Sequence, residues 1–314
     1  MLFKAKRFTA NVSVRLIANV SVRLSWISPI LALTALTAHA ETIQGTVFCN
    51  GAAGHYHSNG GGFVANTAHV DDTAFVEKGA QVCDRAQVTG KSGVHHQAIV
   101  KDRAQLSDVA QVWNTSVISD RARVSGNTHV NGDARISDDA QITEYAVVGK
   151  IGSKTTVKGS SSLSGYSKVT DDAVVTSATL KDNALVDGHA VVTGLGVVIL
   201  RGVANITDYA TVSGSDIEIA NAKVQQHSKV LDQAKVIGVN SIGEGRLELF
   251  GYSEVSGHAN VSESVRVACN AVITDNAQVS GKHTLITGNT RITGKRTVKK
   301  GSYSNTRQLT SIFN

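Results

Sequence analysis

The strongest constraint on the fold is a branched aliphatic residue at every sixth position between residues 64 and 148. No α-helix keeps such positions on one face, because 3.6 residues per turn would spread them around its axis. A β-strand does keep them on one face, since six is a multiple of two. We therefore expect short strands that each point one aliphatic side chain into an interior, with corners between them. The aliphatic positions are Val64, Val70, Val76, Val82, Val88, Val94, Val100, Leu106, Val112, Ile118, Val124, Val130, Ile136, Ile142 and Val148.

A second period indicates how these strands are arranged. The tripeptide Asp-Arg-Ala begins at Asp84, Asp102 and Asp120, and the variant Asp-Asp-Ala begins at Asp138. These starting points are 18 residues apart, so three hexads make one coil. We expect an all-β, three-sided parallel solenoid in which residue i lies over residue i+18, about 4.8 Å away. Each coil then buries its apolar side chains only when its neighbours are present.

The same tripeptides place a column of aspartates beside a column formed by Arg85, Arg103 and Arg121. Opposite charges at this spacing in water attract by only about 1 kcal/mol, and salt screens the attraction. One interpretation is a solvated corner, and the alternative is a ladder that binds calcium or another ligand. Positions two residues after the aliphatic are mostly Asp, Asn or Gly, which tolerate tight corners.

The repeat continues after Val148 with small slips, through a run that includes Val236 and Ile242, and reaches Val298. This predicts one β-helix of roughly thirteen coils over residues 63–298, without a linker. The chain's only proline is Pro29, which suits uninterrupted strand ladders that need every backbone N–H. The basic tail, residues 299–314, is interpreted as a solvated end, with a polyanion site as the alternative.

The first 40 residues have a composition of their own. They contain five basic residues, no acidic residue and an apolar run before Ala38-His39-Ala40. This layout predicts a secretory signal peptide cleaved before Glu41, with a membrane anchor as the alternative. Removing five charges from the formal net charge of +6 leaves about +1, which gives no indication of a nucleic-acid partner. We expect an exported protein (periplasmic, on the cell surface or secreted) without a transmembrane span in the mature chain.

Residues 41–62 depart from the repeat and are expected to cap the first coil, because an exposed parallel edge invites pairing with other chains. Residues 43–48 are predicted to form a strand, and the Gly- and His-rich segment 51–62 a loop. His55 and His57 in that loop are candidate metal ligands, with polar cap residues as the alternative. Cys49 and Cys83 are candidates for a disulfide bond in an oxidising compartment.

The repeat V-x-D-x-A-x, with three hexads per coil, resembles the hexapeptide-repeat left-handed β-helix superfamily. The cadence of residues 134–142 (ARISDDAQI) is similar to that of its uncharacterised acyltransferase-like members. The resemblance implies a left-handed coil and a homotrimer. It also implies, for the acyltransferases, a histidine general base and an acyl-CoA or acyl carrier protein donor. No histidine lies in a matching motif; His95 and His96, predicted to be adjacent on a strand beside the irregular hexad at 91–93, are the best candidates.

Two functions follow from different classes of protein. The first is an exported, non-catalytic scaffold or binding surface for a glycan, a cell-envelope component or a partner protein, without a cofactor. Outward aromatic residues such as Trp113 and Tyr145 would stack on sugar rings, and the arginine column would contribute polar contacts. The alternative is an acyltransferase that uses acyl-CoA, although export makes a CoA donor improbable.

Overall fold

The structure, a computed structural model, describes residues 47–194, 196, 198–214, 217–220, 223–224, 229–231, 248–249, 253–262, 265–281 and 284–304. All of these belong to the compact unit Ala40–Asn314. The predicted signal peptide, the repeat positions Val236 and Ile242, and residues 305–314 of the predicted tail lie outside the described residues.

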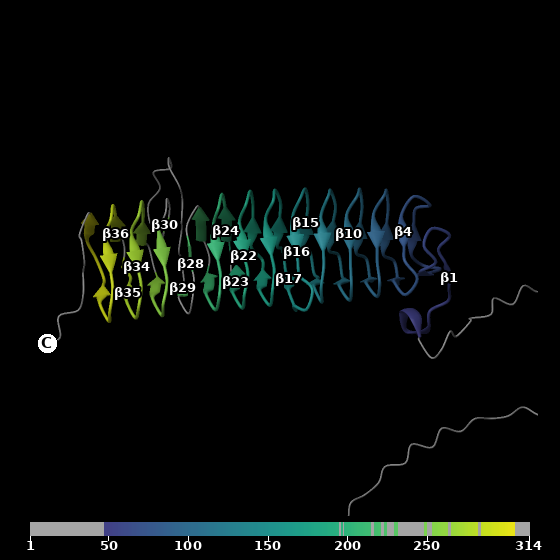
Figure 1. The fold of residues 1–314 in the computed structure, drawn as a ribbon, viewed down its shortest axis with the longest axis horizontal. Helices are drawn as coiled ribbons and strands as arrows, with labels where there is room; N and C mark the ends of the chain where they lie inside the picture. The colour runs from purple at the N-terminus through teal and green to yellow at the C-terminus, as the bar shows by residue number, and fades with distance from the viewer. Residues whose placement is uncertain are drawn as a thin grey trace, which may run out of the picture. The chain divides into compact units, whose positions relative to one another are not determined.

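The chain winds through three sheets in turn, and each circuit of three strands is one coil (Figure 1). We name the sheets in the order in which the chain meets them. Sheet 1 contains β1 (Gly54–Tyr56), β2 (Phe63–Ala65), β5 (Gln81–Val82), β8 (Ile99–Val100), β11 (Val117–Ile118), β14 (Arg135–Ile136), β17 (Thr156–Lys158), β20 (Val174–Thr176), β23 (Val191–Gly194), β26 (Thr211–Gly214), β29 (Lys229–Leu231), β32 (Asn260–Ser262), β35 (Gln278–Val279) and β38 (Thr297–Val298).

Sheet 2 follows sheet 1 in every coil. Its strands are β3 (His69–Val70), β6 (Gln87–Val88), β9 (Gln105–Leu106), β12 (Arg123–Val124), β15 (Gln141–Ile142), β18 (Ser162–Leu163), β21 (Thr179–Leu180), β24 (Val198–Arg201), β27 (Ile217–Ala220), β30 (Glu248–Leu249), β33 (Val265–Val267), β36 (Thr284–Thr287) and β39 (Ser302–Ser304).

Sheet 3 completes each coil and leads back to sheet 1. It contains β4 (Phe75–Val76), β7 (Gly93–Val94), β10 (Gln111–Val112), β13 (His129–Val130), β16 (Val147–Val148), β19 (Lys168–Val169), β22 (Leu185–Val186), β25 (Asn205–Ile206), β28 (Lys223–Val224), β31 (Glu254–Val255), β34 (Val272–Ile273) and β37 (Arg291–Ile292).

The strand register confirms the predicted all-β parallel solenoid and the predicted coil length. Val82 pairs with Val100 and Val112 pairs with Val130, in each case in parallel and with the equivalent position of the next repeat. Where the repeat slips, the sheets continue and the corner changes length. Ile136 pairs with Val157 and not with Lys154, because the corner between β16 and β17 is longer than its counterparts in the preceding coils.

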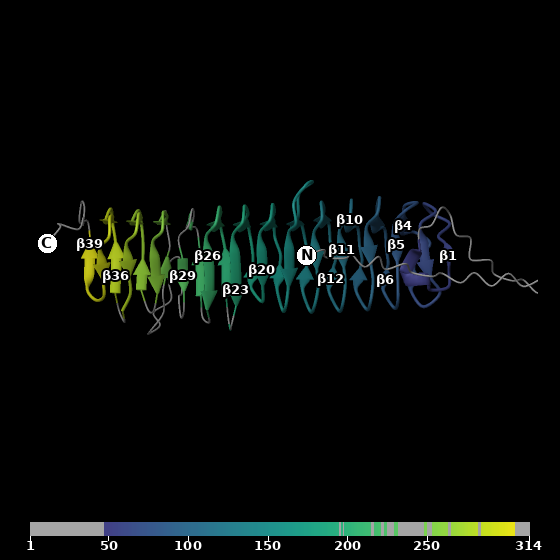
Figure 2. The same cartoon turned by 90° about the horizontal axis from the view of Figure 1, so that it is seen from below.

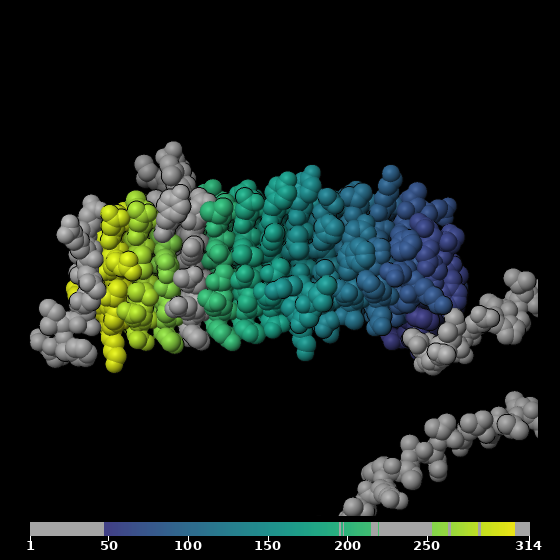
Figure 3. All heavy atoms as spheres, in the orientation of Figure 1, coloured from purple at the N-terminus to yellow at the C-terminus, as the bar shows by residue number. Residues whose placement is uncertain are grey.

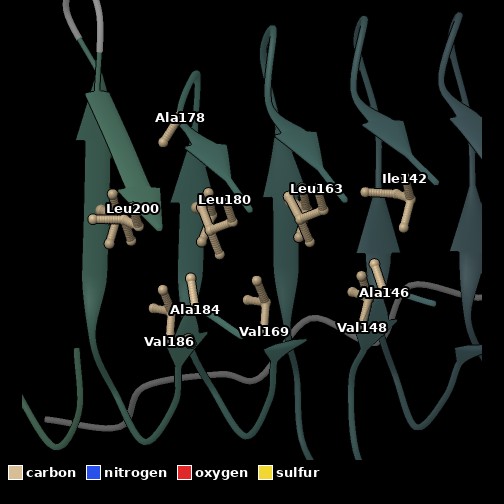
Figure 4. Close-up of a cluster of buried hydrophobic side chains, with 14 of the residues drawn as sticks. Ile142, Ala146, Val148, Leu163, Val169, Ala178, Leu180, Ala184, Val186 and Leu200 are labelled. Carbon is tan, nitrogen blue, oxygen red and sulfur yellow. The ribbon is translucent and has the colours of Figure 1, made fainter. Parts of the chain in front are cut away.

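The core consists of aliphatic side chains stacked in rows along the coil axis. Figure 4 shows one such row, formed by Ile142, Leu163, Leu180 and Leu200, each fully buried. Burial of each of these side chains contributes about 1.5 to 3 kcal/mol. Small corner residues such as Ala146 complete the interior. The space-filling view shows successive coils in contact along the stack (Figure 3).

Acidic residues at the corners explain the Asp and Gly preference of the repeat. Asp84, Asp102 and Asp108 have φ between 58° and 63°, a left-handed conformation that Asp, Asn and Gly adopt most readily. Their carboxylates accept a hydrogen bond from the backbone N–H of the corner one coil later. The N–H of Asp102 donates to Asp84 Oδ2 (3.1 Å), and that of Gly126 donates to Asp108 Oδ2 (2.8 Å).

The N-terminal cap differs from the prediction. Phe48 does not lie in a strand, because Phe48–Gly51 forms the 3₁₀ turn η1; residues 43–46 lie outside the described residues. The Gly- and His-rich segment contains a strand, β1, that pairs antiparallel with β2 and closes the edge of sheet 1. Glycine permits this close approach, because a Cβ at Gly54 would collide with the backbone of Val64.

Cys49 and Cys83 form a disulfide bond with a Cα–Cα distance of 5.3 Å, which joins η1 to the corner after β5. Phe48 stacks on Phe63 with ring centroids 5.3 Å apart, so the cap has an aromatic contact as well as a covalent one. At the other end, β39 extends the stack beyond the predicted limit at residue 298, since Tyr303 pairs with Ile286 and packs against the core.

Replacement of Asp108 tests the role of the corner carboxylates. Asp108→Ala removes the acceptor for the Gly126 N–H and places a Cβ-bearing residue without a polar group at φ 63°. We expect a loss of about 1 to 3 kcal/mol in unfolding free energy, measured by chemical denaturation. Asp108→Asn keeps an acceptor oxygen and tolerates this φ, so it is the control. An equal loss of unfolding free energy in both variants would show that the charge of Asp108, and not the geometry of the corner, stabilises the fold.

Candidate functional site

One concave feature among the described residues is a groove on the corner between sheets 1 and 2. Its volume is about 850 Å³, and the residues that form it come from four successive coils. This corner lies opposite sheet 3, because three sheets enclose the axis. The groove is lined by Asp84, Arg85, Asp102, Arg103, Asp120, Arg121, Asp138 and Asp139.

One oxygen of each aspartate in the repeated column is used by the fold. The backbone N–H of Asp120 donates to Asp102 Oδ2 (3.3 Å), that of Asp138 donates to Asp120 Oδ2 (3.2 Å), and that of Gly159 donates to Asp138 Oδ2 (2.8 Å). In the part of the chain that the structure describes, the Oδ1 atoms of Asp84 and Asp102 have no hydrogen-bond partner. Each of these two coils therefore presents a carboxylate oxygen that can accept a hydrogen bond from a ligand.

The three arginines of the groove are not equivalent. Arg121 Nε and Nη2 donate to the two carboxylate oxygens of Asp139 at 2.7 and 2.6 Å. This bidentate hydrogen bonding lowers the pKa of Asp139 and raises that of Arg121. Arg85 and Arg103 are exposed and have no such partner within the described ranges. Their guanidinium groups are therefore available as hydrogen-bond donors.

A second cluster surrounds His95 near the N-terminal cap. The His95 ring stacks on Trp113 with centroids 3.7 Å apart and an interplanar angle of 7°. His95 Nε2 lies 2.8 Å from Gln111 Oε1, and His95 Nδ1 lies 3.4 Å from Glu77 Oε2. The backbone N–H of His96 donates to the same Glu77 oxygen at 3.0 Å. This hydrogen bond is the main reason that the pKa of Glu77 is lowered.

The hydrogen bonds of this cluster determine the role of His95. Gln111 Nε2 donates to the carbonyl oxygen of Val109 (3.0 Å), which directs Gln111 Oε1 toward His95. Because that oxygen can only accept, His95 Nε2 is the donor in this hydrogen bond. His95 Nδ1 faces the Glu77 carboxylate. Both ring nitrogens are therefore occupied, and the side chain is only 12% exposed. This geometry is that of a structural link between three coils, and a general-base role for His95 would require one of these contacts to break.

The prediction that His95 and His96 share a strand is wrong. Both follow β7 and belong to the corner between sheets 3 and 1, where His96 is exposed and has φ 57°. The irregular hexad has a packing reason, since a Cβ at Gly93 would collide with Gln111 Oε1 and His95 Nε2. Glycine at this position makes room for the hydrogen bond between those two side chains.

The structure separates the two histidines of the cap. His57 is buried, and its Nε2 donates to the carbonyl oxygen of Ala74 (3.1 Å), whereas His55 is exposed on β1. The described residues contain no group of three or more His, Cys, Asp or Glu side chains that is placed to hold a metal ion. His57 thus has a structural contact, and the structure does not bring a third ligand to the pair.

The aromatic side chains are stacked on one another along the coil axis. Tyr145 lies on Tyr166 with ring centroids 4.9 Å apart and an interplanar angle of 10°, as Trp113 lies on His95. A ring face that is covered by a neighbouring ring is not available to a sugar. The predicted stacking of a glycan on Trp113 and Tyr145 therefore stays a prediction, limited to ring faces that no other ring covers.

Comparisons of the chain with protein-family models, with curated proteins and with solved structures find no match. Among the described residues, no helix has the length and apolar character needed to span a membrane. The chemistry of the groove and of the His95 cluster is therefore inferred from their geometry.

The carboxylate of Glu77 is expected to stabilise the cap only while it is ionised. Its folded-state pKa is below the ordinary value of 4.5, so its contribution is present above that value and is lost as the pH falls through the lowered pKa. We expect the difference in Tm between wild type and Glu77→Gln to be largest near neutral pH and to shrink in acid. Thermal unfolding between about pH 3 and pH 7 measures it. A difference that is constant over this range would contradict the assignment.

Proposed function

We propose that this protein is an exported, non-catalytic β-solenoid that binds a neutral, linear glycan chain along the groove between sheets 1 and 2. The observation that carries the proposal is the pair of unpartnered guanidinium groups of Arg85 and Arg103, within the described ranges, beside aspartates with a free oxygen. Donor and acceptor thus recur once per coil, about 4.8 Å apart along the axis.

The hydrogen-bonding chemistry of the groove suits a polyhydroxylated ligand. A sugar hydroxyl both donates and accepts, so it can donate to a carboxylate oxygen while it accepts from a guanidinium N–H. Adjacent hydroxyls on one ring can engage Asp102 and Arg103 together, and the next ring can engage the following coil. Hydrogen bonds to charged groups are stronger than those between neutral groups, which offsets part of the cost of displacing water.

The balance of charge in the groove favours a neutral chain over a polyanion. The lining has five carboxylates and three guanidinium groups, and one of the three is already paired with Asp139. The nearby Lys101 adds a cation, but its Nζ lies 3.3 Å from Asp102 Oδ2. A uronate polymer or a nucleic acid would meet repulsion from the aspartate column.

Export is supported by two features of the chain. The basic and then apolar first 40 residues have the layout of a signal peptide, and the bond between Cys49 and Cys83 suits an oxidising compartment. A glycan partner in the cell envelope or outside the cell is consistent with that location. His95, one of the two candidate bases, gives the acyltransferase alternative no support, because both of its ring nitrogens already have partners.

Isothermal titration with neutral linear glucan and mannan oligosaccharides, and with a polyuronate of equal length, tests this function. We expect neutral chains to bind and the polyuronate to bind more weakly or not at all. Arg85→Gln combined with Arg103→Gln should weaken binding at least about tenfold, because two charged hydrogen-bond donors are lost. Asp84→Asn combined with Asp102→Asn should also weaken it while preserving the corner conformation.

The matched control is Arg291→Gln combined with Lys295→Gln, which removes the same charge from exposed positions in distant coils. This variant should bind as the wild type does. The proposal is wrong if no neutral chain binds or if the polyuronate binds more tightly than the neutral chains. It is also wrong if the double variant of Arg85 and Arg103 binds neutral chains as tightly as the control variant does. An acetyl-transfer assay with acetyl-CoA should give no activity for the wild type. Activity that disappears in His96→Ala would instead support the acyltransferase.

A further inference from the structure

The positive charge of the chain is concentrated in the last coil that the structure describes. Residues 288–304 contain five basic side chains and no acidic one. Residues 41–314 carry about +1 in total, so subtracting these five charges leaves about −4 for the rest of that range. Charge asymmetry of this kind indicates a region that contacts an anionic partner. We call these five residues the basic cluster: Arg291, Lys295, Arg296, Lys299 and Lys300.

The basic cluster lies on the last strands and corners of the stack. β37, β38 and β39 are the end strands of sheets 3, 1 and 2. Arg291 is the first residue of β37, and Lys295 lies in the corner between β37 and β38. Lys299 and Lys300 lie in the corner between β38 and β39. Figure 2 shows the yellow strands β36 and β39 at one end of the stack and β1 at the other. The cations are thus distributed around the C-terminal end of the described solenoid.

The charge of the cluster is not neutralised within the described ranges. Four of its side chains are exposed and form no ion pair there, namely Arg291, Lys295, Lys299 and Lys300. Elsewhere an exposed lysine such as Lys150 does have a partner, since its Nζ lies 3.1 Å from Asp171 Oδ1. The preceding coil, residues 270–287, has one carboxylate, and its Oδ2 accepts a hydrogen bond from the backbone N–H of Gly294 (2.9 Å). The four cations therefore remain for a ligand.

The fold holds the backbone of the doubly basic corner in place. Tyr303 packs against the core, and its hydroxyl donates to the carbonyl oxygen of Lys300 (3.2 Å). The backbone N–H of Ser280 donates to the carbonyl oxygen of Val298 (2.8 Å), directly before the corner. Each lysine ammonium, by contrast, is carried on a flexible four-carbon stem that can extend beyond the last strand.

The placement of these cations fits a surface better than a linear polymer. A linear ligand that runs along the axis meets one side of the solenoid, as in the Asp–Arg groove, where Arg85, Arg103 and Arg121 recur once per coil. The basic cluster instead occupies a single coil and includes one sheet and two corners. A flat anionic surface that meets the end of the stack can contact both corners at once.

We propose that the basic cluster docks the C-terminal end of the solenoid onto the phosphate headgroups of an anionic lipid bilayer. Lysine ammonium and arginine guanidinium groups both bind phosphate oxygens through charge-assisted hydrogen bonds. Each cation near an anionic bilayer strengthens binding about fivefold, and the attraction falls off within a Debye length of about 10 Å. A cluster of four unpaired cations therefore gives a reversible, salt-dependent attachment.

This attachment is independent of the proposed glycan function, because the basic cluster and the Asp–Arg groove share no residue. The groove lies in coils between Asp84 and Asp139, so contact at the C-terminal end leaves it open to a ligand. A variant that loses the bilayer should still bind a neutral glycan as the wild type does. Failure of one proposal can therefore be distinguished from failure of the other.

Co-sedimentation with lipid vesicles tests the inference. The chain is used from Glu41, because Ala40–Asn314 is one compact unit and the first 40 residues carry five cations of their own. The wild type should bind vesicles of phosphatidylcholine with about one third phosphatidylglycerol, and should not bind phosphatidylcholine alone. Lys295→Gln, Lys299→Gln and Lys300→Gln combined should weaken binding about a hundredfold, since three cations are lost. Salt at about 1 M should abolish binding, because the Debye length falls to about 3 Å.

The matched control combines Lys91→Gln, Lys158→Gln and Lys168→Gln, which removes three exposed lysine charges from other coils. It should bind within about twofold of the wild type, because charges beyond a Debye length are screened. Far-ultraviolet circular dichroism and Tm establish that each variant is folded. The inference is overturned if the wild type binds neither vesicle or both equally, or if the folded cluster variant binds as the control does. Tighter binding of soluble polyphosphate than of vesicles at equal phosphate concentration would also overturn it and would identify a linear polyanion as the partner.

Discussion

The structure depends on contact between successive coils. Most strands are very short, and their outward N–H groups donate to carbonyl oxygens one coil later, as Gln105 does to Ala122. The inward aliphatic side chains are likewise buried only between the coils on either side. An isolated coil would have neither set of contacts, while its ordering would cost about 1 to 2 kcal/mol per residue. The need for neighbours explains why the first coil requires a cap with an antiparallel strand, a disulfide bond and stacked aromatic rings.

The corners determine which side chains remain for function. A corner residue with positive φ is restricted to Asp, Asn, Gly and a few others, and its carboxylate is used to bind the N–H of the next corner. The side chain of the residue after it makes no such hydrogen bond to the next corner, and Arg85 and Arg103 occupy this position. The groove thus combines aspartate carboxylates, which hold the corners together, with the guanidinium groups of Arg85 and Arg103, which the corners do not need. Arg121 differs only because the following coil has Asp139 where the earlier coils have arginine.

The three-sided cross-section separates the charged corner from the aromatic side chains. Phe75, His95, Trp113, Tyr145 and Tyr166 all lie on sheet 3 or its borders, opposite the Asp–Arg groove. Their rings stack along the axis because equivalent positions in successive coils lie about one strand spacing apart. Some of this stacking is structural, as at His95, which links Glu77, Gln111 and Trp113 across three coils. Further along the chain, the rings of Tyr145 and Tyr166 are exposed.

The amino-acid sequence by itself determined the class of fold, because a six-residue spacing of aliphatic side chains fits strands and not helices. It also determined the coil length, since the Asp-Arg-Ala tripeptides recur every 18 residues and residues that far apart pair in the sheets, as Val112 and Val130 do. It pointed to Cys49 and Cys83 as a pair and to the arginine column as a candidate site. Periodicity carries this information because identical coils repeat identical environments.

Only the tertiary structure decided the features that depend on contacts between particular side chains. The 3₁₀ turn at Phe48 and the strand at Gly54–Tyr56 fall outside the repeat, so their conformation depends on the edge that they cover. The engagement of both His95 nitrogens depends on how Gln111 and Glu77 approach from the neighbouring coils, and the pairing of Arg121 depends on one residue of the next coil. Spacing along the chain does not specify such contacts, since they are set by side-chain direction and by the neighbours that each coil meets.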